Sequence, residues 1–193
     1  MNTSTDFRFR VVIATIIAFV AWSPCGAQSF NWDWQKAQIV PNQPLSDASL
    51  SEPEKAALAA AIAKEISHQD DTRGPQKEPK EAALETRVLI TDLNRDGRPE
   101  IIAQGEVGCS ADGNCPLWVF RKVTGTYKLL LDGVGQTFTL QQSYTNGFRD
   151  IVVAMHGSAF DSTLTVYRYQ NGSTMIESAL SLLGWLAGTL HLS

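Results

Sequence analysis

Residues 92–100 carry oxygen-bearing side chains at alternating positions. In Asp92-Leu-Asn-Arg-Asp-Gly-Arg-Pro-Glu100 these side chains occupy positions one, three, five and nine, and the Arg98 carbonyl is available at position seven. Calcium takes about six to eight oxygen ligands, and alternating positions on a tight turn can point their oxygens inward. Gly97 at position six permits the sharp bend. Because crowded carboxylates repel one another without a cation, the spacing predicts a calcium-binding loop.

The loop differs from a helix–loop–helix calcium site, because its position twelve is Ala103 and its flanks have β-type composition. The pattern D-x-N-x-D-G-x-x-E between two strands resembles the calcium loops of FG-GAP and VCBS-type β-repeat proteins. The match is specific from Thr91 to Ile101 and extends loosely to Tyr169. The resemblance implies that the calcium ligands are Asp92, Asn94, Asp96, Arg98 through its backbone, and Glu100.

An alternative for the same loop is an Asp-Gly hairpin turn whose Asp and Asn side chains bond their own backbone. Such a turn needs one or two acidic residues, whereas this loop has oxygen-bearing side chains at four alternate positions. We favour calcium, with the weak affinity of extracellular modules, a Kd of about 10⁻⁴ to 10⁻³ M.

A second chemical candidate is the segment His156-Gly-Ser-Ala-Phe-Asp161, which brings His, Ser and Asp together in sequence. A hydrolase nucleophile elbow needs G-x-S-x-G on a strand-to-helix turn, which this segment lacks. A polar loop after a strand is therefore the favoured interpretation. If the protein were a hydrolase, His156 would act with an acidic partner such as Asp150 or Asp161, and a concave pocket would surround it.

Cys109 and Cys115, with five residues between them, lie in a loop rich in Gly, Asp and Asn. An even pair in an exported chain predicts a disulfide; two free thiols or half of a metal site are the alternatives. The closed loop is short, so the bond would fix local shape. The surrounding segment 105–116 is either a protruding recognition element or a loop in which the disulfide only fixes the local shape.

The first 27 residues predict export. Arg8 and Arg10 precede an apolar run, Val11 to Trp22, and a Ser-Pro step and small residues follow. This order is typical of a signal peptide cleaved after Ala27, and 12 apolar residues are few for a membrane span. A retained anchor is the alternative. We expect a periplasmic or secreted protein without a stable membrane span after cleavage.

Charge excludes one class of partner. The net charge of −4 becomes −5 when residues 1–27, with two Arg and one Asp, are removed. Without a basic patch, nucleic acid is not an expected partner.

The expected secondary structure changes along the chain, from a helical part to a β-type part that contains the loop. Residues 28–84 are predicted to form an extended lead segment, a helix over 52–67 that begins at the capping box Ser51-Glu-Pro-Glu54, and a solvated linker over 67–83. From residue 85 short β-type runs follow one another. They are 87–91, 100–104, 117–121, 127–131, 137–141, 150–154 and 163–169.

These runs repeat within residues 85–178. Gly97-Arg-Pro-Glu-Ile-Ile-Ala aligns with Gly147-Phe-Arg-Asp-Ile-Val-Val at an offset of 50, and Leu117–Arg121 aligns with Leu164–Arg168 at an offset of 47. Two units cannot close a propeller. We therefore expect a mainly β domain with one N-terminal helix (α+β), in which two repeated antiparallel units pack as a sandwich or a partial propeller-like domain.

Two further expectations follow from the repeat. The loop equivalent to 92–100 has Gln142, Tyr144, Asn146 and Asp150, so only the first copy should bind calcium. The apolar tail 179–193 has no counterpart in the first copy.

The favoured function is an exported, non-catalytic calcium-binding module that interacts with an unidentified envelope or extracellular protein. Alternatives are a periplasmic inhibitor or immunity-type protein and, with less support, a hydrolase that uses His156.

Overall fold

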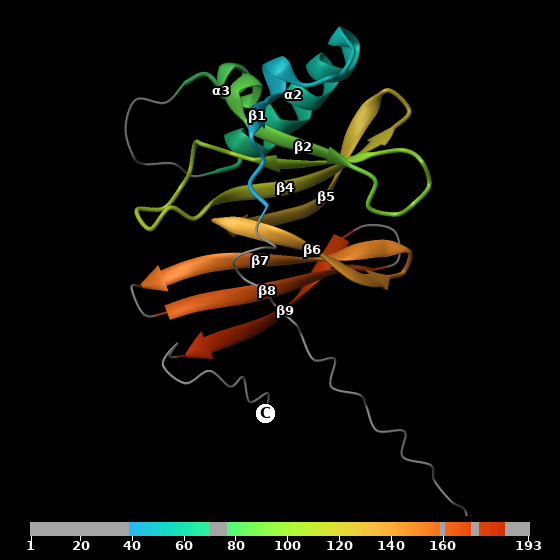
Figure 1. Ribbon diagram of the computed structural model, residues 1–193. Helices are drawn as coiled ribbons and strands as arrows, with labels where there is room; N and C mark the ends of the chain where they lie inside the picture. The colour runs from blue at the N-terminus through green and yellow to red at the C-terminus, as the bar shows by residue number, and fades with distance from the viewer. Residues whose placement is uncertain (1–38, 70–76, 159–160, 171–173, 184–193) are drawn as a thin grey trace, which may run out of the picture. The chain divides into compact units, whose positions relative to one another are not determined.

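Antiparallel strands dominate the protein, of which the computed structural model describes residues 39–69, 77–158, 161–170 and 174–183 (Figure 1). All of these belong to one unit, Asp33–Ser193. The elements, in chain order, are β1 (Gln43–Pro44), a 3-10 turn η1 (Leu45–Asp47), α2 (Glu52–Ser67), α3 (Pro79–Glu85), β2 (Arg87–Thr91), β3 (Glu100–Gln104), β4 (Cys115–Val123), β5 (Thr126–Gly135), β6 (Thr137–Thr145), β7 (Phe148–Ser158), β8 (Asp161–Gln170) and β9 (Thr174–Leu183).

The strands form two antiparallel sheets. The first has the order β1-β2-β3-β4-β5 and the second the order β6-β7-β8-β9. Each therefore contains a four-stranded meander, because consecutive strands from β2 to β5 and from β6 to β9 pair with one another. The prediction of a mainly β fold with antiparallel pairing is confirmed.

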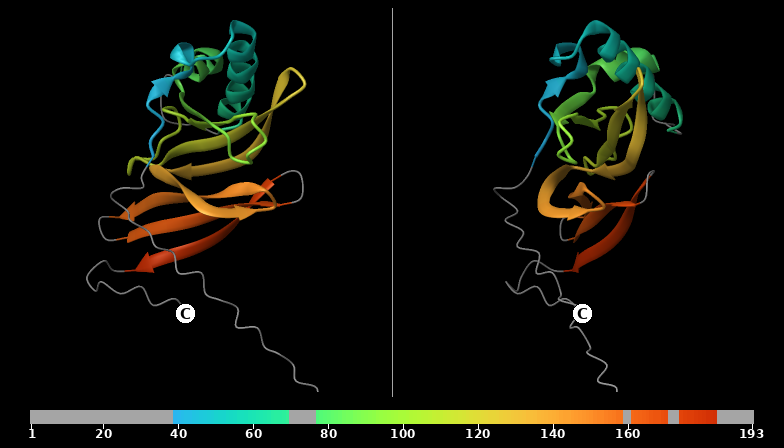
Figure 2. Two further views of the ribbon diagram at one scale, coloured as in Figure 1. Left: turned by 45° about the vertical axis from the view of Figure 1, so that its right-hand side comes forward. Right: turned by 90° about the vertical axis from the view of Figure 1, so that its right-hand side faces the viewer.

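The first sheet is covered on both faces. Along β3 and β4 the side chains alternate between two cores, as the two-residue period of a strand requires. Ile101 and Trp118 pack with the helices α2 and α3, whereas Ile102 and Val119 pack with residues of the second sheet. Helices, first sheet and second sheet thus form three layers (Figures 1 and 2).

The two meanders have matching register. In the β3–β4 pair, Ile101 lies opposite Phe120 and Gln104 opposite Leu117. Adding the sequence offsets of 50 and 47 gives Ile151 opposite Tyr167 and Ala154 opposite Leu164, which are pairs of β7 and β8. Gly97 and Gly147, at the same offset, both have positive φ, at 77° and 86°.

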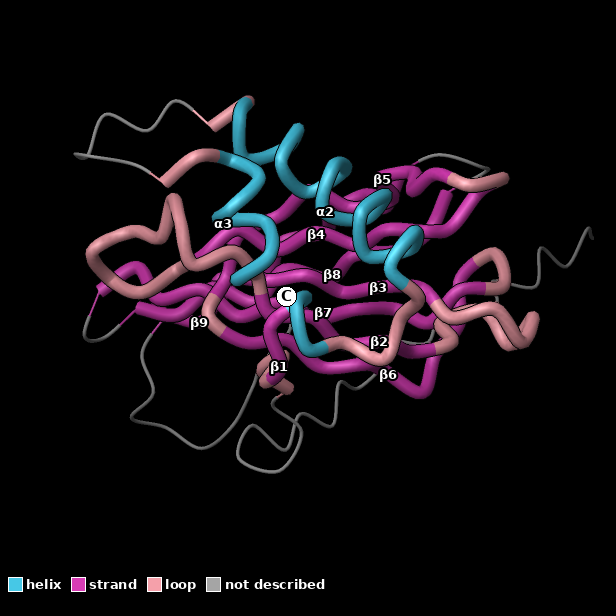
Figure 3. Tube along the Cα trace, turned by 90° about the horizontal axis from the view of Figure 1, so that it is seen from above, coloured by secondary structure: helices cyan, strands magenta, loops and turns pink. Residues whose placement is uncertain are grey.

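The helix predicted over 52–67 is present as α2. Glu54 accepts a hydrogen bond from the Ser51 backbone N–H at 3.0 Å, which completes the capping box. Seen from the helix side, α2 crosses the first sheet and contacts β5 (Figure 3). Leu58, Ile62 and Ile66 form its buried stripe.

Two sequence expectations about elements are wrong. The linker predicted over 67–83 includes the start of a second helix, α3, because Pro79 suits a first helical turn and Ala82 and Ala83 are buried against α2 and the sheet. The expectation that the tail 179–193 has no counterpart in the first copy is also wrong, because its first five residues belong to β9, which pairs with β8 from Thr174 to Leu183. β9 is thus the counterpart of β5 in the second meander.

The predicted signal peptide, residues 1–27, and the end of the tail, residues 184–193, lie outside the described residues. Within the described part of the chain, no helix is both long and apolar enough to span a bilayer.

Candidate functional site

The predicted calcium loop forms the connection between β2 and β3. Its turn is tight: Arg95 has φ of 61° and Gly97 has φ of 77°, a region that glycine adopts without steric cost. Leu93 anchors the loop, because its side chain is fully buried in the core shared by the two sheets. The Leu93 carbonyl accepts a hydrogen bond from the Arg149 N–H of β7 at 2.8 Å.

Asp92 organises the backbone of the turn. One carboxylate oxygen accepts hydrogen bonds from the N–H groups of Asn94 (3.2 Å) and Arg95 (2.7 Å), and the other accepts one from Gly97 (2.9 Å). A carboxylate that accepts several backbone N–H groups fixes the loop locally. These bonds are the kind expected for the self-bonded Asp-Gly turn.

Asn94 and Asp96 continue this pattern on the exposed side of the loop. Asn94 Oδ1 accepts from the Asp96 N–H at 3.1 Å, and Asp96 Oδ1 accepts from the Arg98 N–H at 2.8 Å. The Asn94 amide donates to Asp96 Oδ2 at 2.9 Å. The Arg98 backbone bond, the Asn94 amide and the Arg121 guanidinium together lower the pKa of Asp96, which favours its anionic form.

Glu100 is the buried member of the set, with a side chain that is 0% exposed. Its Oε2 accepts the Leu93 N–H at 2.9 Å, whereas its Oε1 is buried and has no hydrogen-bond partner. Burial raises the pKa of Glu100, and the Leu93 N–H and Arg121 oppose that rise. An unsatisfied buried carboxylate oxygen is costly, so this atom identifies where a ligand would be stabilising.

Arg121 of β4 is the side chain that sequence reasoning missed. Its Nη2 donates to Asp96 Oδ2 at 2.8 Å, and its Nε lies 3.7 Å from Glu100 Oε1. The guanidinium therefore lies against two of the predicted ligands. The alignment of Arg121 with Arg168 in the repeat was the available signal, because equivalent Arg residues in two copies indicate a shared role.

The donor set fits calcium in chemistry but is not assembled around one point. Among the described residues, no group of three or more His, Cys, Asp or Glu side chains is arranged to hold a metal ion. The oxygens of Asp92, Asn94 and Asp96 bond backbone N–H groups instead. Glu100 Oε1 has no hydrogen-bond partner and lies 3.7 Å from Arg121 Nε, and it is a hard oxygen of the type that binds a calcium ion.

The second copy contains a reduced form of the same arrangement. Asp150 of β7, 3% exposed, takes the place of Glu100, and Arg168 Nε lies 3.7 Å from its Oδ2. Ser143 donates to that same oxygen at 2.7 Å, and Asp150 Oδ1 is buried without a hydrogen-bond partner. Asn146 donates to the Tyr169 carbonyl at 2.8 Å and Tyr144 faces Arg95, so these positions do not gather around Asp150.

Arg95 connects the loop to the second sheet. Its Nε donates to the Tyr144 hydroxyl at 2.7 Å, and its guanidinium lies 4.0 Å from the centre of the Tyr144 ring. A cation over an aromatic face is attracted by the ring quadrupole. The loop is therefore part of the junction between the two sheets.

The other end of β3 carries the predicted cysteine loop. Cys109 and Cys115 form a disulfide, as predicted. Asn114 is nearly buried and pairs with the backbone of His156 in both directions, donating to its carbonyl at 2.7 Å and accepting from its N–H at 2.9 Å. Gln136 donates to the Asp112 carbonyl at 2.5 Å. Segment 105–116 is therefore tied to the second sheet, while residues 111–113 at its tip are exposed.

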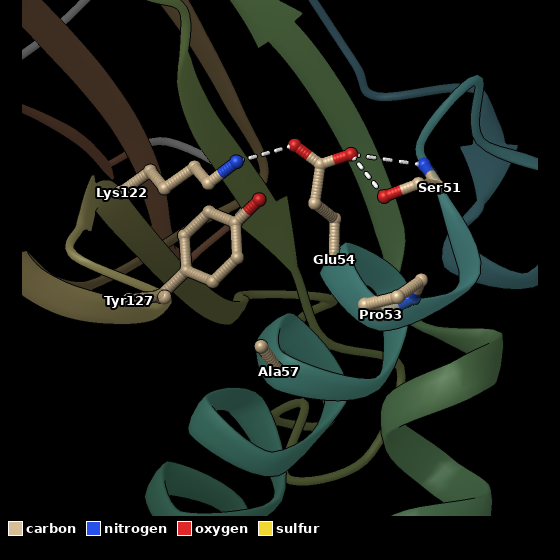
Figure 4. Close-up of a pocket in the computed structure, with 7 residues that line it drawn as sticks. Ser51, Pro53, Glu54, Ala57, Lys122 and Tyr127 are labelled. Atoms are coloured by element: carbon tan, nitrogen blue, oxygen red, sulfur yellow. Dashed lines mark hydrogen bonds and ion pairs between the residues drawn. The ribbon is translucent and has the colours of Figure 1, made fainter.

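Two surface hollows of the described residues lie away from the loop. One, of about 360 Å³, lies between the start of α2 and the β4–β5 hairpin, where Glu54 accepts hydrogen bonds from Ser51 and Lys122 (Figure 4). The other is formed by α2 and α3. Neither includes His156, and the Asp161 side chain lies outside the description. The hydrolase alternative gains no support from these hollows.

Comparison of the chain with protein-family models, curated proteins and solved structures found no match. The function must therefore be argued from the site itself.

Proposed function

We propose that the protein is an exported, non-catalytic β-module whose 92–100 loop binds one calcium ion. The observation that carries the proposal is the buried Glu100 Oε1, which lacks a hydrogen-bond partner at the base of a loop with two further carboxylates. A hard divalent cation would satisfy this oxygen and reduce the repulsion among Asp92, Asp96 and Glu100.

Charge supports the proposal. Arg121 contacts two of the three loop carboxylates, Asp96 and Glu100, and the loop itself also carries Arg95 and Arg98. In the second copy one carboxylate, Asp150, meets one guanidinium, Arg168. The segment 92–100 carries three carboxylates, whereas the equivalent segment 142–150 carries one. The ligands would therefore be those predicted: Asp92, Asn94, Asp96, the Arg98 carbonyl and Glu100.

The module is proposed to be a sandwich of two copies of one four-stranded unit. Three features support the duplication: the shared register of β3–β4 and β7–β8, the positive φ at Gly97 and Gly147, and the carboxylate–arginine pair at the same strand positions. All three recur at the sequence offsets of 47 and 50, as a duplication predicts. A two-copy sandwich leaves no propeller channel, so function would reside in loops and surfaces.

Calcium is proposed to stabilise a scaffold that presents a surface to an envelope or extracellular protein. The loop contacts the second sheet through Arg95 and Leu93, so ordering it would stabilise the junction between the sheets. The exposed tip of the disulfide loop, residues 111–113, is the proposed contact surface. An inhibitor or immunity-type protein would be a special case of this proposal, in which the partner is the protein that it inhibits or neutralises.

Thermal unfolding in calcium and in chelator tests the calcium proposal. We expect 5 mM calcium, about 5 to 50 times the expected Kd, to raise the Tm of the wild type by a few degrees, as about 1–2 kcal/mol of linkage predicts. Asp96→Ala should abolish the rise. Gln142→Ala, at the position equivalent to Asp92 in the second copy, is the matched control and should keep it. Equal Tm values for the wild type in calcium and chelator contradict the proposal.

The partner proposal has a separate test. Wild-type protein and a variant with Ala111 and Asp112 replaced by Gly are used as bait in an envelope extract, with calcium or with chelator. The proposal expects one protein captured by the wild type in calcium and lost in chelator and with the variant. Capture that depends on neither contradicts it.

A further inference from the structure

Arg121 contacts two of the predicted calcium ligands of the loop, Asp96 and Glu100. It reaches the loop from β4, so its position is fixed by strand pairing and not by the loop itself. Its Nη2 donates to Asp96 Oδ2 at 2.8 Å, and its Nε is 3.7 Å from the unpartnered Glu100 Oε1. The two oxygens that it contacts both belong to predicted calcium ligands.

A guanidinium and a calcium ion compete for the same electron pairs. An oxygen that accepts a short N–H hydrogen bond has less electron density to offer a cation, and two positive charges a few ångströms apart repel strongly where water is partly excluded. Glu100 is fully buried and Arg121 is 35% exposed, so this repulsion is only partly screened. Calcium and the observed Arg121 position therefore disfavour each other.

The second copy shows what the arginine does alone. Arg168 lies at the same distance, 3.7 Å, from the buried carboxylate of Asp150, and Ser143 Oγ donates to that carboxylate. At Asp150, a guanidinium and a hydroxyl contact one buried carboxylate, and the neighbouring loop has no further carboxylates. An arginine is thus the partner that the two buried carboxylates share, and in the first sheet the loop carboxylates Asp92 and Asp96 add a second possible partner, the metal ion.

Arg121 can leave the carboxylates at low cost. Its guanidinium lies 5.4 Å from the centre of the Phe148 ring, and about a third of its side chain is in contact with solvent. The Phe148 ring belongs to β7 and packs on Tyr169 at 4.1 Å. A released guanidinium can remain over this ring or extend into water, so either destination keeps its charge solvated or stabilised.

We propose that Arg121 is an internal competitor for the calcium ion, and that it sets the calcium affinity of the loop. Without the ion, Arg121 neutralises Asp96 and Glu100 and keeps the apo protein folded. With the ion bound, Arg121 moves away from Asp96 and Glu100 toward Phe148. The calcium ion then replaces the guanidinium as the positive partner of these carboxylates. This inference rests on the calcium-binding function proposed above.

Calcium titration by calorimetry of Arg121→Met tests the inference, with Arg168→Met as the matched control from the second copy. Arg121→Met should bind calcium at least tenfold more tightly than the wild type. Arg121→Lys, which keeps the charge but loses the forked donor geometry, should fall between the two. Arg168→Met should bind calcium as the wild type does, because Asp150 is not a ligand.

Urea unfolding gives a second readout, which distinguishes competition with calcium from a purely structural role of Arg121. In chelator both methionine variants should be less stable than the wild type, since each leaves a buried carboxylate unpaired. Saturating calcium should restore most of the loss in Arg121→Met and none of it in Arg168→Met.

The outcomes separate this inference from the proposed function. Unchanged or weaker calcium binding by Arg121→Met and Arg121→Lys, with binding retained in the wild type, overturns the inference alone. Binding by Arg121→Met without binding by the wild type overturns the proposed function and supports the competition. Absence of binding in every variant overturns both.

Discussion

The two buried carboxylates of this protein occupy equivalent places in two matching sheets but have different surroundings. Glu100 lies at the base of a loop that contains Asp92 and Asp96, and shares Arg121 with Asp96. Asp150 has Ser143 and Arg168, and its loop contributes Gln142 and Tyr144 in place of ligands with full negative charge. The register of the β3–β4 pair matches that of the β7–β8 pair, whereas the acidic side chains of the segments before β3 and β7 differ.

This difference indicates that the carboxylate–arginine pair is part of the framework and the loop is the specialised part. A buried ion pair is weak evidence for added stability but strongly destabilising to break. Retaining the pair in both sheets therefore needs no ligand. The additional carboxylates at 92 and 96 do need an explanation, and a divalent cation supplies one.

The largest effect is expected when the loop loses Asp92. Asp92→Ala removes the acceptor of three backbone N–H groups and should lower the free energy of unfolding by about 2–3 kcal/mol in chelator. Gln142→Ala, the equivalent change in the second copy, should stay within about 0.5 kcal/mol. Urea unfolding of both variants measures the difference. Equal losses would show that the two loops are not specialised differently.

Removal of the disulfide should have the next largest effect. The connection between β3 and β4 is long and cross-linked, whereas only two residues separate β7 from β8 in the sequence. Replacing both Cys109 and Cys115 by Ser should cost about 2 kcal/mol, as expected for a closed loop of this length. Calcium affinity should be unchanged, because the disulfide loop follows the opposite end of β3 from Glu100. A large change in calcium affinity would contradict this separation.

Asn114 tests whether the first copy is fastened to the second through this loop. Asn114→Ala leaves the N–H and carbonyl of His156 without the partners they have in the structure, and should cost about 1–2 kcal/mol. Asp112→Ala, whose exposed side chain is removed while its backbone remains, should cost less than about 0.5 kcal/mol. Hydrogen exchange of the His156 amide in the two variants locates the change. Equal protection of the His156 amide in the two variants would contradict the idea that Asn114 fastens the loop to the second sheet.

The smallest effect concerns the helix that covers only the first sheet. Hydrogen bonds from Lys122 and Ser51 lower the pKa of Glu54 from its ordinary value of 4.5 to about 2. The stabilisation is therefore present above pH 4.5 and is lost as the pH falls toward 2. Glu54→Gln should be less stable than the wild type at pH 7 and should converge with it near pH 2. Stability curves that stay parallel over this range would refute the assignment.

Sequence patterns predicted much of this framework. The runs 87–91 and 100–104 are β2 and β3 with the same bounds, and the internal offsets of 50 and 47 match the register of the strand pairs. β9 was missed because Thr174–Leu183 has Ala, Ser, Glu and Leu in place of the β-branched residues typical of strands. Its pairing with β8 decides its conformation, and that is tertiary information.

The candidate site could be predicted only in part, because some of its residues meet only through tertiary structure. The ligand-type residues of 92–100 lie in one loop, so spacing alone gathered them. Arg121 lies 21 residues beyond Glu100 in another strand, and only the β3–β4 pairing brings it to the loop. Asn114 meets His156 across two sheets, at a sequence separation of 42, which no local pattern reveals.

Isothermal titration of the wild-type protein with calcium tests the central claim most directly. The account predicts binding with one site per chain, lost in Asp96→Ala and kept in Gln142→Ala. Two sites per chain would show that the second copy also binds, and the absence of any binding heat at millimolar calcium, together with no thermal shift, would contradict the assignment of the 92–100 loop as a calcium site.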